Sequence, residues 1–176
     1  MQDTALELFA EKGYERTSLR EISERLEVTK AALYYHFKTK EDIVVSLFTD
    51  LMAPIDALIA WSKEQPPTLE TKHEILARYS LALADAAPLF RLMQENRATM
   101  RELSIGKNFE DHMTALLDQL VPDDAALTDR VRGFSALLLG RVGAFALADV
   151  EGSPEEKRKA VLEVATGLVA QAHRSV

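Results

Sequence analysis

The sequence contains no cysteine among its 176 residues. Disulfides, thiolate metal sites and cysteine nucleophiles are therefore excluded, and a cytoplasmic chain is the simplest interpretation. A run of about 18 apolar residues, which a membrane-spanning helix needs, is also missing. The N-terminus lacks the charged-then-apolar order of a signal peptide. We therefore expect a cytoplasmic protein with no membrane partner.

A positive net charge is missing as well, because the formal net charge at pH 7 is −7. This negative net charge argues against a protein that coats nucleic acid by nonspecific electrostatic attraction. Residues 28–40 nevertheless contain Lys30, Lys38 and Lys40 and neither aspartate nor glutamate. A short basic segment in an acidic chain is typical of a site-specific DNA-binding protein.

Catalytic and metal-binding patterns are absent. The four histidines are never paired at the four-residue spacing of a helical metal site, and no glycine-rich phosphate loop follows a strand. Asn108, Glu110, Asp111 and His112 are close in sequence, but consecutive helical residues point apart and indicate a solvated face. We expect no enzyme, no metal and no cofactor.

Helical periodicity dominates in place of strand alternation, and the fold class is predicted to be all-α. The first helix is expected to end at Gly13 in a left-handed conformation, and Ser18 with Glu21 forms a capping box for the second. Glu27 and Val28 form a turn, after which Thr29 caps a third helix. A long helix from Lys40 to about Lys63 is expected to link this unit to the rest.

The remaining chain reads as a helical body. Pro66 and Pro67 require a loop. One helix is then expected to about Ala86 and another from Pro88 through Met100. After a break at 104–106, a further helix is expected to continue to Leu120. The last two helices, 124 to about 150 and one capped by Ser153, are apolar on too many sides for a single chain. A four-helix interface between two copies would cover them, which predicts a homodimer.

Residues 17–40 have the outline of a helix-turn-helix that reads DNA. Leu33 and Phe37 are expected to point inward, which leaves the polar side of the third helix outward. A purely structural role is the alternative to DNA contact for several of these residues. In that case Tyr34 and Tyr35 pack against their neighbours, His36 and Ser18 cap helices, and Lys40 is only solvated. The predicted DNA-contacting residues are Thr17, Ser18, Thr29, Lys30, Ala31, Tyr34, Tyr35, His36 and Lys40.

The body offers large apolar side chains for an effector cavity. For each of them singly, ordinary core packing is the more common role. Arg141 lies within an apolar run and needs an acid or an anionic ligand, and we favour a structural ion pair. The predicted lining is Trp61, Tyr79, Phe90, Met93, Met100, Phe109, Met113, Arg141 and Phe145.

The segment ALELFAEKGYERTSLREISERLEVTKAALYYHFKTKEDIV resembles the TetR (tetracycline-repressor-like) family of transcriptional regulators. The spacing of Phe9, Gly13, Tyr14, Leu33 and Phe37 is part of this resemblance. It implies an N-terminal three-helix helix-turn-helix domain, residues 1–45, and a C-terminal helical effector and dimerisation domain, residues 46–176. It also implies a homodimer, a double-stranded DNA operator and a small effector. The chain departs from the family at Ser23, where alanine is usual, and at Glu27, where glycine is usual. The first helix also begins almost at Met1, where members commonly have a basic segment.

The leading hypothesis is a ligand-responsive transcriptional repressor that binds a near-palindromic operator as a homodimer and responds to a largely apolar molecule. The alternative is a helical dimeric module that binds a small molecule or protein without specific DNA recognition. Its motivation is the acidic net charge and Glu27 in the turn.

Overall fold

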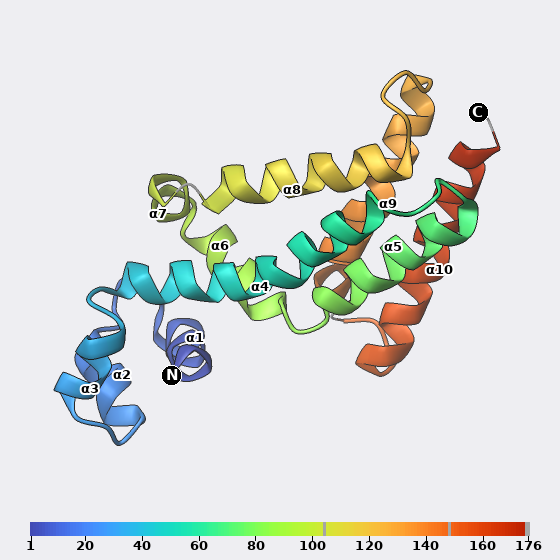
Figure 1. Ribbon diagram of the computed structural model, residues 1–176. Coiled ribbons are helices and arrows are strands. Elements are labelled where there is room, and N and C mark those ends of the chain that lie inside the picture. The colour runs from blue at the N-terminus through green and yellow to red at the C-terminus, as the bar shows by residue number, and fades with distance from the viewer. Residues whose placement is uncertain (104, 148, 175–176) are drawn as a thin grey trace. The chain divides into compact units, whose positions relative to one another are not determined.

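A computed structural model describes residues 1–103, 105–147 and 149–174, without the side chains of 106, 142 and 144–146. All regular elements in these ranges are α-helices (Figure 1). Their bounds are α1 Gln2–Lys12, α2 Leu19–Arg25, α3 Lys30–His36, α4 Lys40–Ser62, α5 Leu69–Ala82, α6 Ala87–Glu95, α7 Arg97–Glu102, α8 Ile105–Leu120, α9 Leu127–Ala146 and α10 Pro154–His173. The all-α prediction is confirmed.

The chain divides into two compact units. Unit 1 comprises 1–52 and 88–108, and unit 2 comprises 53–87 and 109–176. All of the predicted N-terminal domain, residues 1–45, lies in unit 1. The helix α4 contributes its first part to unit 1 and its second part to unit 2, with Pro54 just past the division.

Local signals in the sequence set the ends of the first helices. Gly13 ends α1 with φ 88°, as its lack of a Cβ allows, although its ψ of 146° differs from that of a left-handed cap. The capping box of α2 is present, because the Ser18 hydroxyl accepts from Glu21 N and the Glu21 carboxylate accepts from Ser18 N. Hydrogen bonds from Lys12 and Ser18 lower the pKa of Glu21 to about 2. Thr29 caps α3 by accepting from Ala32 N.

Several predicted helix ends were wrong. One helix was expected from Pro88 through Met100, but Asn96 separates α6 from α7. Its Nδ2 donates to Leu92 O at 2.9 Å, and a short amide side chain that bonds the backbone competes with the helix. Helix α8 begins at Ile105, within the expected break at 104–106, and Ser104 lies outside the described residues. Helices α5 and α9 are both shorter than expected.

By length and composition α4 could cross a membrane, whereas we expected no such helix. Core helices of soluble proteins pass the same test. Within unit 1, Asp50 of α4 accepts from Gln2 Nε2 at 2.7 Å, and within unit 2, Asp56 lies 2.7 Å from His112 Nε2. Ile43 and Ile55 are almost fully buried in the protein. We therefore assign α4 to the packed helices of the fold.

In unit 2, α10 packs along α9 and also against α5. The approach of α9 to α10 is close, since a Cβ added to Gly143 would lie 2.6 Å from Val161 Cγ2. The core between these helices contains Ile75, Leu76, Leu137, Ala165 and Val169, each at most 3% exposed.

The turn between α2 and α3 carries conformational strain at Glu27, whose φ is 55°. A left-handed residue other than glycine costs roughly 1–2 kcal/mol. Glycine there would relieve this strain and lose roughly 0.5–1 kcal/mol through its freedom in the unfolded chain. We expect Glu27→Gly to raise the free energy of unfolding by roughly 0.5–1 kcal/mol, as measured by urea denaturation followed by circular dichroism.

The matched control is Glu24→Gly, three residues earlier in α2. It has no left-handed strain to relieve and should lower the free energy of unfolding by about 1 kcal/mol. A loss of similar size in Glu27→Gly would contradict the strain assigned to this turn.

Candidate nucleic-acid interface

The helix α3 is held to the rest of unit 1 by one side only. Leu33 is fully buried, and Phe37, which ends the helix, is half-buried. The hydrophobic side chains Leu8, Phe9 and Ile22 of α1 and α2 complete this core. The predicted inward direction of Leu33 and Phe37 is confirmed, and it turns the opposite side of α3 to solvent.

The outer side of α3 exposes two large aromatic side chains. Tyr34 is 42% exposed and Tyr35 is 80% exposed. The Tyr35 ring meets the His36 ring edge to face at 5.2 Å. An exposed tyrosine presents both an apolar ring and a hydroxyl, which is the chemistry that touches thymine methyls and phosphate oxygens. Thr29, Lys30 and Ala31 are exposed as well.

The charges around α3 favour a polyanion on this side. The first turn of α3 contains no acid. Three acids of α1 and α2 are paired with neighbouring bases: Glu21 with Lys12 at 2.9 Å, Glu24 with Arg20 at 2.7 Å, and Glu11 with Arg25 at 2.9 Å. The charges of each pair cancel locally. Lys30 is an exposed cation with no ion pair among the described residues, and Glu27, in the turn before α3, is an exposed acid.

Two of the predicted contacts have roles inside the protein. Thr17 is only 2% exposed, and its hydroxyl is hydrogen-bonded to Gly13 O at 2.9 Å, with Leu8 O at 3.3 Å. A hydroxyl directed into the core cannot reach a phosphate, so we remove Thr17 from the candidate interface. Lys40 Nζ donates to Tyr14 O at 2.8 Å and lies 4.4 Å from the centre of the Tyr14 ring. Its ammonium therefore holds the chain after α1, and we remove Lys40 too.

Arg16, beside Thr17, was missed by the sequence reasoning. Its side chain is exposed and has no ion pair or hydrogen bond among the described residues. It lies in the turn between α1 and α2, outside any periodic pattern, so the sequence offered only its charge as a signal. With Ser18, which is also exposed, it forms a second polar group near the start of α2.

The start of α4 is fixed to this unit by Tyr14. The Tyr14 hydroxyl donates to Glu41 Oε1 at 2.7 Å, and its ring packs against Phe9 at 5.1 Å. Burial, together with the hydrogen bond to Glu41, raises the pKa of Tyr14. The Glu41 carboxylate thus ties α4 to the turn after α1.

The predicted effector-lining residues are divided between the two units. Phe90, Met93 and Met100 are buried in unit 1. In unit 2, the Tyr79 hydroxyl donates to Met113 Sδ at 3.1 Å. The remaining members of the set lie in unit 2 as well: Trp61 under the Arg78 guanidinium, Phe109 under Arg141 at 4.6 Å, and Phe145, whose side chain lies outside the described residues.

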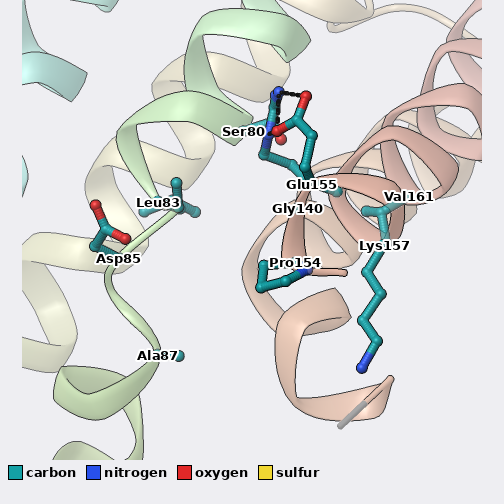
Figure 2. Close-up of a pocket in the computed structure, with 11 residues that line it drawn as sticks. Ser80, Leu83, Asp85, Ala87, Gly140, Pro154, Glu155, Lys157 and Val161 are labelled. Carbon is teal, nitrogen blue, oxygen red and sulfur yellow. Dashed lines mark hydrogen bonds and ion pairs between the residues drawn. The ribbon is translucent and has the colours of Figure 1, made fainter. Parts of the chain in front are cut away.

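A cavity in unit 2 has walls formed by other residues. It measures about 500 Å³ and is formed by the end of α5, the segment after it, α9 and α10 (Figure 2). Within the described ranges, no three histidine or acidic side chains are placed to hold a metal ion.

Known proteins resemble this chain in two ways. A family described as "Bacterial regulatory proteins, tetR family" matches residues 2–47. The HTH-type negative transcriptional regulator IcaR of the biofilm operon icaADBC from Staphylococcus epidermidis is 51% identical over 41 residues, 23% of this chain and 22% of IcaR. The transposon Tn10 TetC protein of Escherichia coli is 44% identical over 52 residues, 30% of this chain and 26% of TetC. The match thus spans about a quarter of these relatives.

Solved structures resemble almost the whole chain. A transcriptional regulator of the TetR/AcrR type from Aquifex aeolicus has a TM-score of 0.68 at 23% identity, with 92% of this chain and 93% of that one covered. The TetR family transcriptional regulator PfmR from Thermus thermophilus has a TM-score of 0.65 at 22% identity, with 94% and 96% covered. These proteins are described as regulators and not as enzymes. The resemblance seen in the sequence is confirmed: residues 2–47 form a tetR-family helix-turn-helix domain, within a chain that has the fold of solved TetR-family transcriptional regulators.

Proposed function

We propose that this protein is a cytoplasmic, ligand-responsive transcriptional repressor that binds a near-palindromic DNA operator as a homodimer. The observation that carries the proposal is the outer side of α3, where Lys30, Tyr34 and Tyr35 are exposed on a helix anchored from behind by Leu33. A helix presented in this way fits the major groove. The contacts we propose are Arg16, Ser18, Thr29, Lys30, Ala31, Tyr34, Tyr35 and His36.

The acidic molecule is expected to depend on pairing for affinity. One copy offers few free cations, and each phosphate contact adds only a small electrostatic contribution. Two copies related by a two-fold axis would place their α3 helices in successive major grooves, about 34–36 Å apart. The operator would then carry the same two-fold symmetry as the protein.

The surface that would join the two copies lies on α9 and α10. Leu127, Val131 and Phe134 of α9 are between 48% and 79% exposed, and Val164 of α10 is 56% exposed. Gly167, one turn after Val164, lies inside α10 with nothing within 4 Å of where its Cβ would be. Glycine weakens a helix interior by about 1 kcal/mol relative to alanine. Nothing within the chain requires it there, but close approach of a second helix would.

The DNA contacts can be tested with a paired substitution. We expect Lys30→Ala with Tyr34→Ala to weaken operator binding by roughly 100-fold or more, because a good base contact contributes roughly 1–3 kcal/mol and each copy loses its own. The operator is first obtained by selecting bound sequences from random DNA, and affinity is then measured by fluorescence anisotropy at fixed salt. Circular dichroism checks that the variant is folded.

The control for this substitution is Lys63→Ala, an exposed lysine in unit 2 with no ion pair among the described residues. It should leave the affinity within about twofold, because Lys63 is not part of the candidate interface and solvent and salt largely screen an exposed charge. Selection that enriches no sequence, with binding that only falls steeply as salt rises, would instead favour a module without specific DNA recognition.

The dimer surface can be tested separately from DNA. We expect Val164→Asp to weaken self-association at least about tenfold, because an unpaired carboxylate is costly to bury and each copy would bury one. Sedimentation velocity measures the dissociation constant. Val150→Asp is the matched control, because Val150 is 52% exposed but lies in the turn after α9. Equal association of both variants and the unaltered protein would rule out α10 as the joining surface.

A further inference from the structure

The cavity in unit 2 differs from the lining that the sequence suggested and has a defined chemistry of its own. In Figure 2, Leu83, Asp85 and Ala87 lie along one side, with Pro154, Lys157 and Val161 along the other. The complete lining is Ser80, Leu83, Ala84, Asp85, Ala87, Gly140, Pro154, Glu155, Lys157, Arg158 and Val161. Its volume of about 500 Å³ falls in the usual range for small-molecule sites.

The walls of this cavity are mostly apolar. Leu83 from the end of α5 and Val161 from α10 contribute branched aliphatic side chains, and Pro154 contributes its ring. Gly140 of α9 contributes only backbone to the wall. A side chain there would crowd the Tyr79 ring, which lies 3.0 Å from where the Cβ would be. The cavity therefore suits an apolar body without a polar group along its length.

One largely buried polar residue lines this cavity. Ser80 is 7% exposed, and its hydroxyl has no hydrogen bond within the described part of the chain. A hydrogen bond between neutral groups contributes roughly 0.5–1.5 kcal/mol net. A ligand that donates to Ser80 or accepts from it would gain that contribution, so Ser80 favours a ligand with a polar end.

Of the two acids in the cavity lining, Glu155 has basic partners and Asp85 has none among the described residues. Glu155 accepts from Arg158 at 2.9 Å and lies 3.6 Å from Lys159, so these bases already have an acid. Lys157 also has an interaction elsewhere in the protein. Asp85, in the turn after α5, is exposed and has no ion pair or hydrogen bond among the described residues. The lining thus contains two acids and two bases, and Asp85 is the acid without a partner in the described part of the chain.

We propose that this cavity binds an amphipathic cation, with its apolar body between α5 and α10 and its ammonium group at Asp85. An anionic ligand would have to draw Arg158 away from Glu155, or Lys157 away from its own interaction, and it would meet the Asp85 carboxylate. Only the role of this ligand as an effector depends on the proposed function; binding itself does not.

The charge preference is testable with three probes that share one apolar chain: decylamine, decanol and decanoate. Isothermal titration calorimetry of the DNA-free protein, with each probe below its micelle concentration, gives the three dissociation constants. We expect decylamine to bind roughly tenfold more tightly than decanol, the scale of one partly solvated charge pair, and decanoate to bind most weakly.

Two variants locate the binding site. Asp85→Asn keeps the shape of the side chain and should reduce the affinity for decylamine to that for decanol. Asp124→Asn is the matched control. Asp124 lies outside the cavity and is an exposed acid with no partner among the described residues, so this variant should still bind decylamine more tightly than decanol. Ala84→Trp fills the cavity from an exposed wall position and should abolish binding of all three probes.

The inference is overturned if Asp85→Asn retains the preference for decylamine, if decanoate binds most tightly, or if Ala84→Trp leaves binding unchanged. Operator affinity with and without decylamine is measured separately. Binding that leaves operator affinity unchanged supports the cavity but rejects its effector role. Failure of the unaltered protein to recognise any DNA sequence rejects the proposed function while the calorimetric result still stands.

Discussion

The structure of unit 1 depends on the contacts that converge on Tyr14. The ring packs against Phe9, the hydroxyl donates to Glu41, and the carbonyl oxygen accepts from Lys40. Lys40 and Glu41 are the first two residues of α4. A single residue after α1 thus fixes where α4 begins relative to α1, and α3 occupies the short span of chain before it. A DNA-contacting helix needs such fixed geometry, because base contacts lose their discrimination when their side chains are misplaced.

The sequence predicted best the features whose cause is local. The capping box of Ser18 and Glu21, the Thr29 cap and the inward position of Leu33 depend on residues within four positions of each other. The left-handed conformation of Glu27 occurs at the position where the resemblance to the TetR family implies glycine. The sequence did not reveal contacts with distant partners, such as the hydrogen bond from Lys40 to a carbonyl 26 positions away.

The position of the cavity also could not be predicted from local sequence patterns. Its lining comes from residues 80–87 and from 140–161, which only tertiary packing brings together. Six of the large side chains that looked suited to a pocket are buried in the cores of the two units instead, among them Tyr79 and Met113. The cavity lining instead includes small residues such as Gly140, Ala84 and Ala87. Apolar periodicity predicts burial, and it cannot distinguish a filled core from a cavity wall.

A ligand in this cavity can influence DNA binding only if it has different affinities for two arrangements of the protein. The chain passes between the units at three places, after Met52, Ala87 and Asn108. One of them, Ala87, is part of the cavity lining, and Pro54 in α4 lies near another. Proline removes one backbone hydrogen bond from the helix, which makes α4 easier to bend at that point. If the ligand prefers one arrangement of either segment, its binding would be coupled to DNA binding. By reciprocity, DNA would weaken binding of that ligand by the same factor by which the ligand weakens binding of DNA.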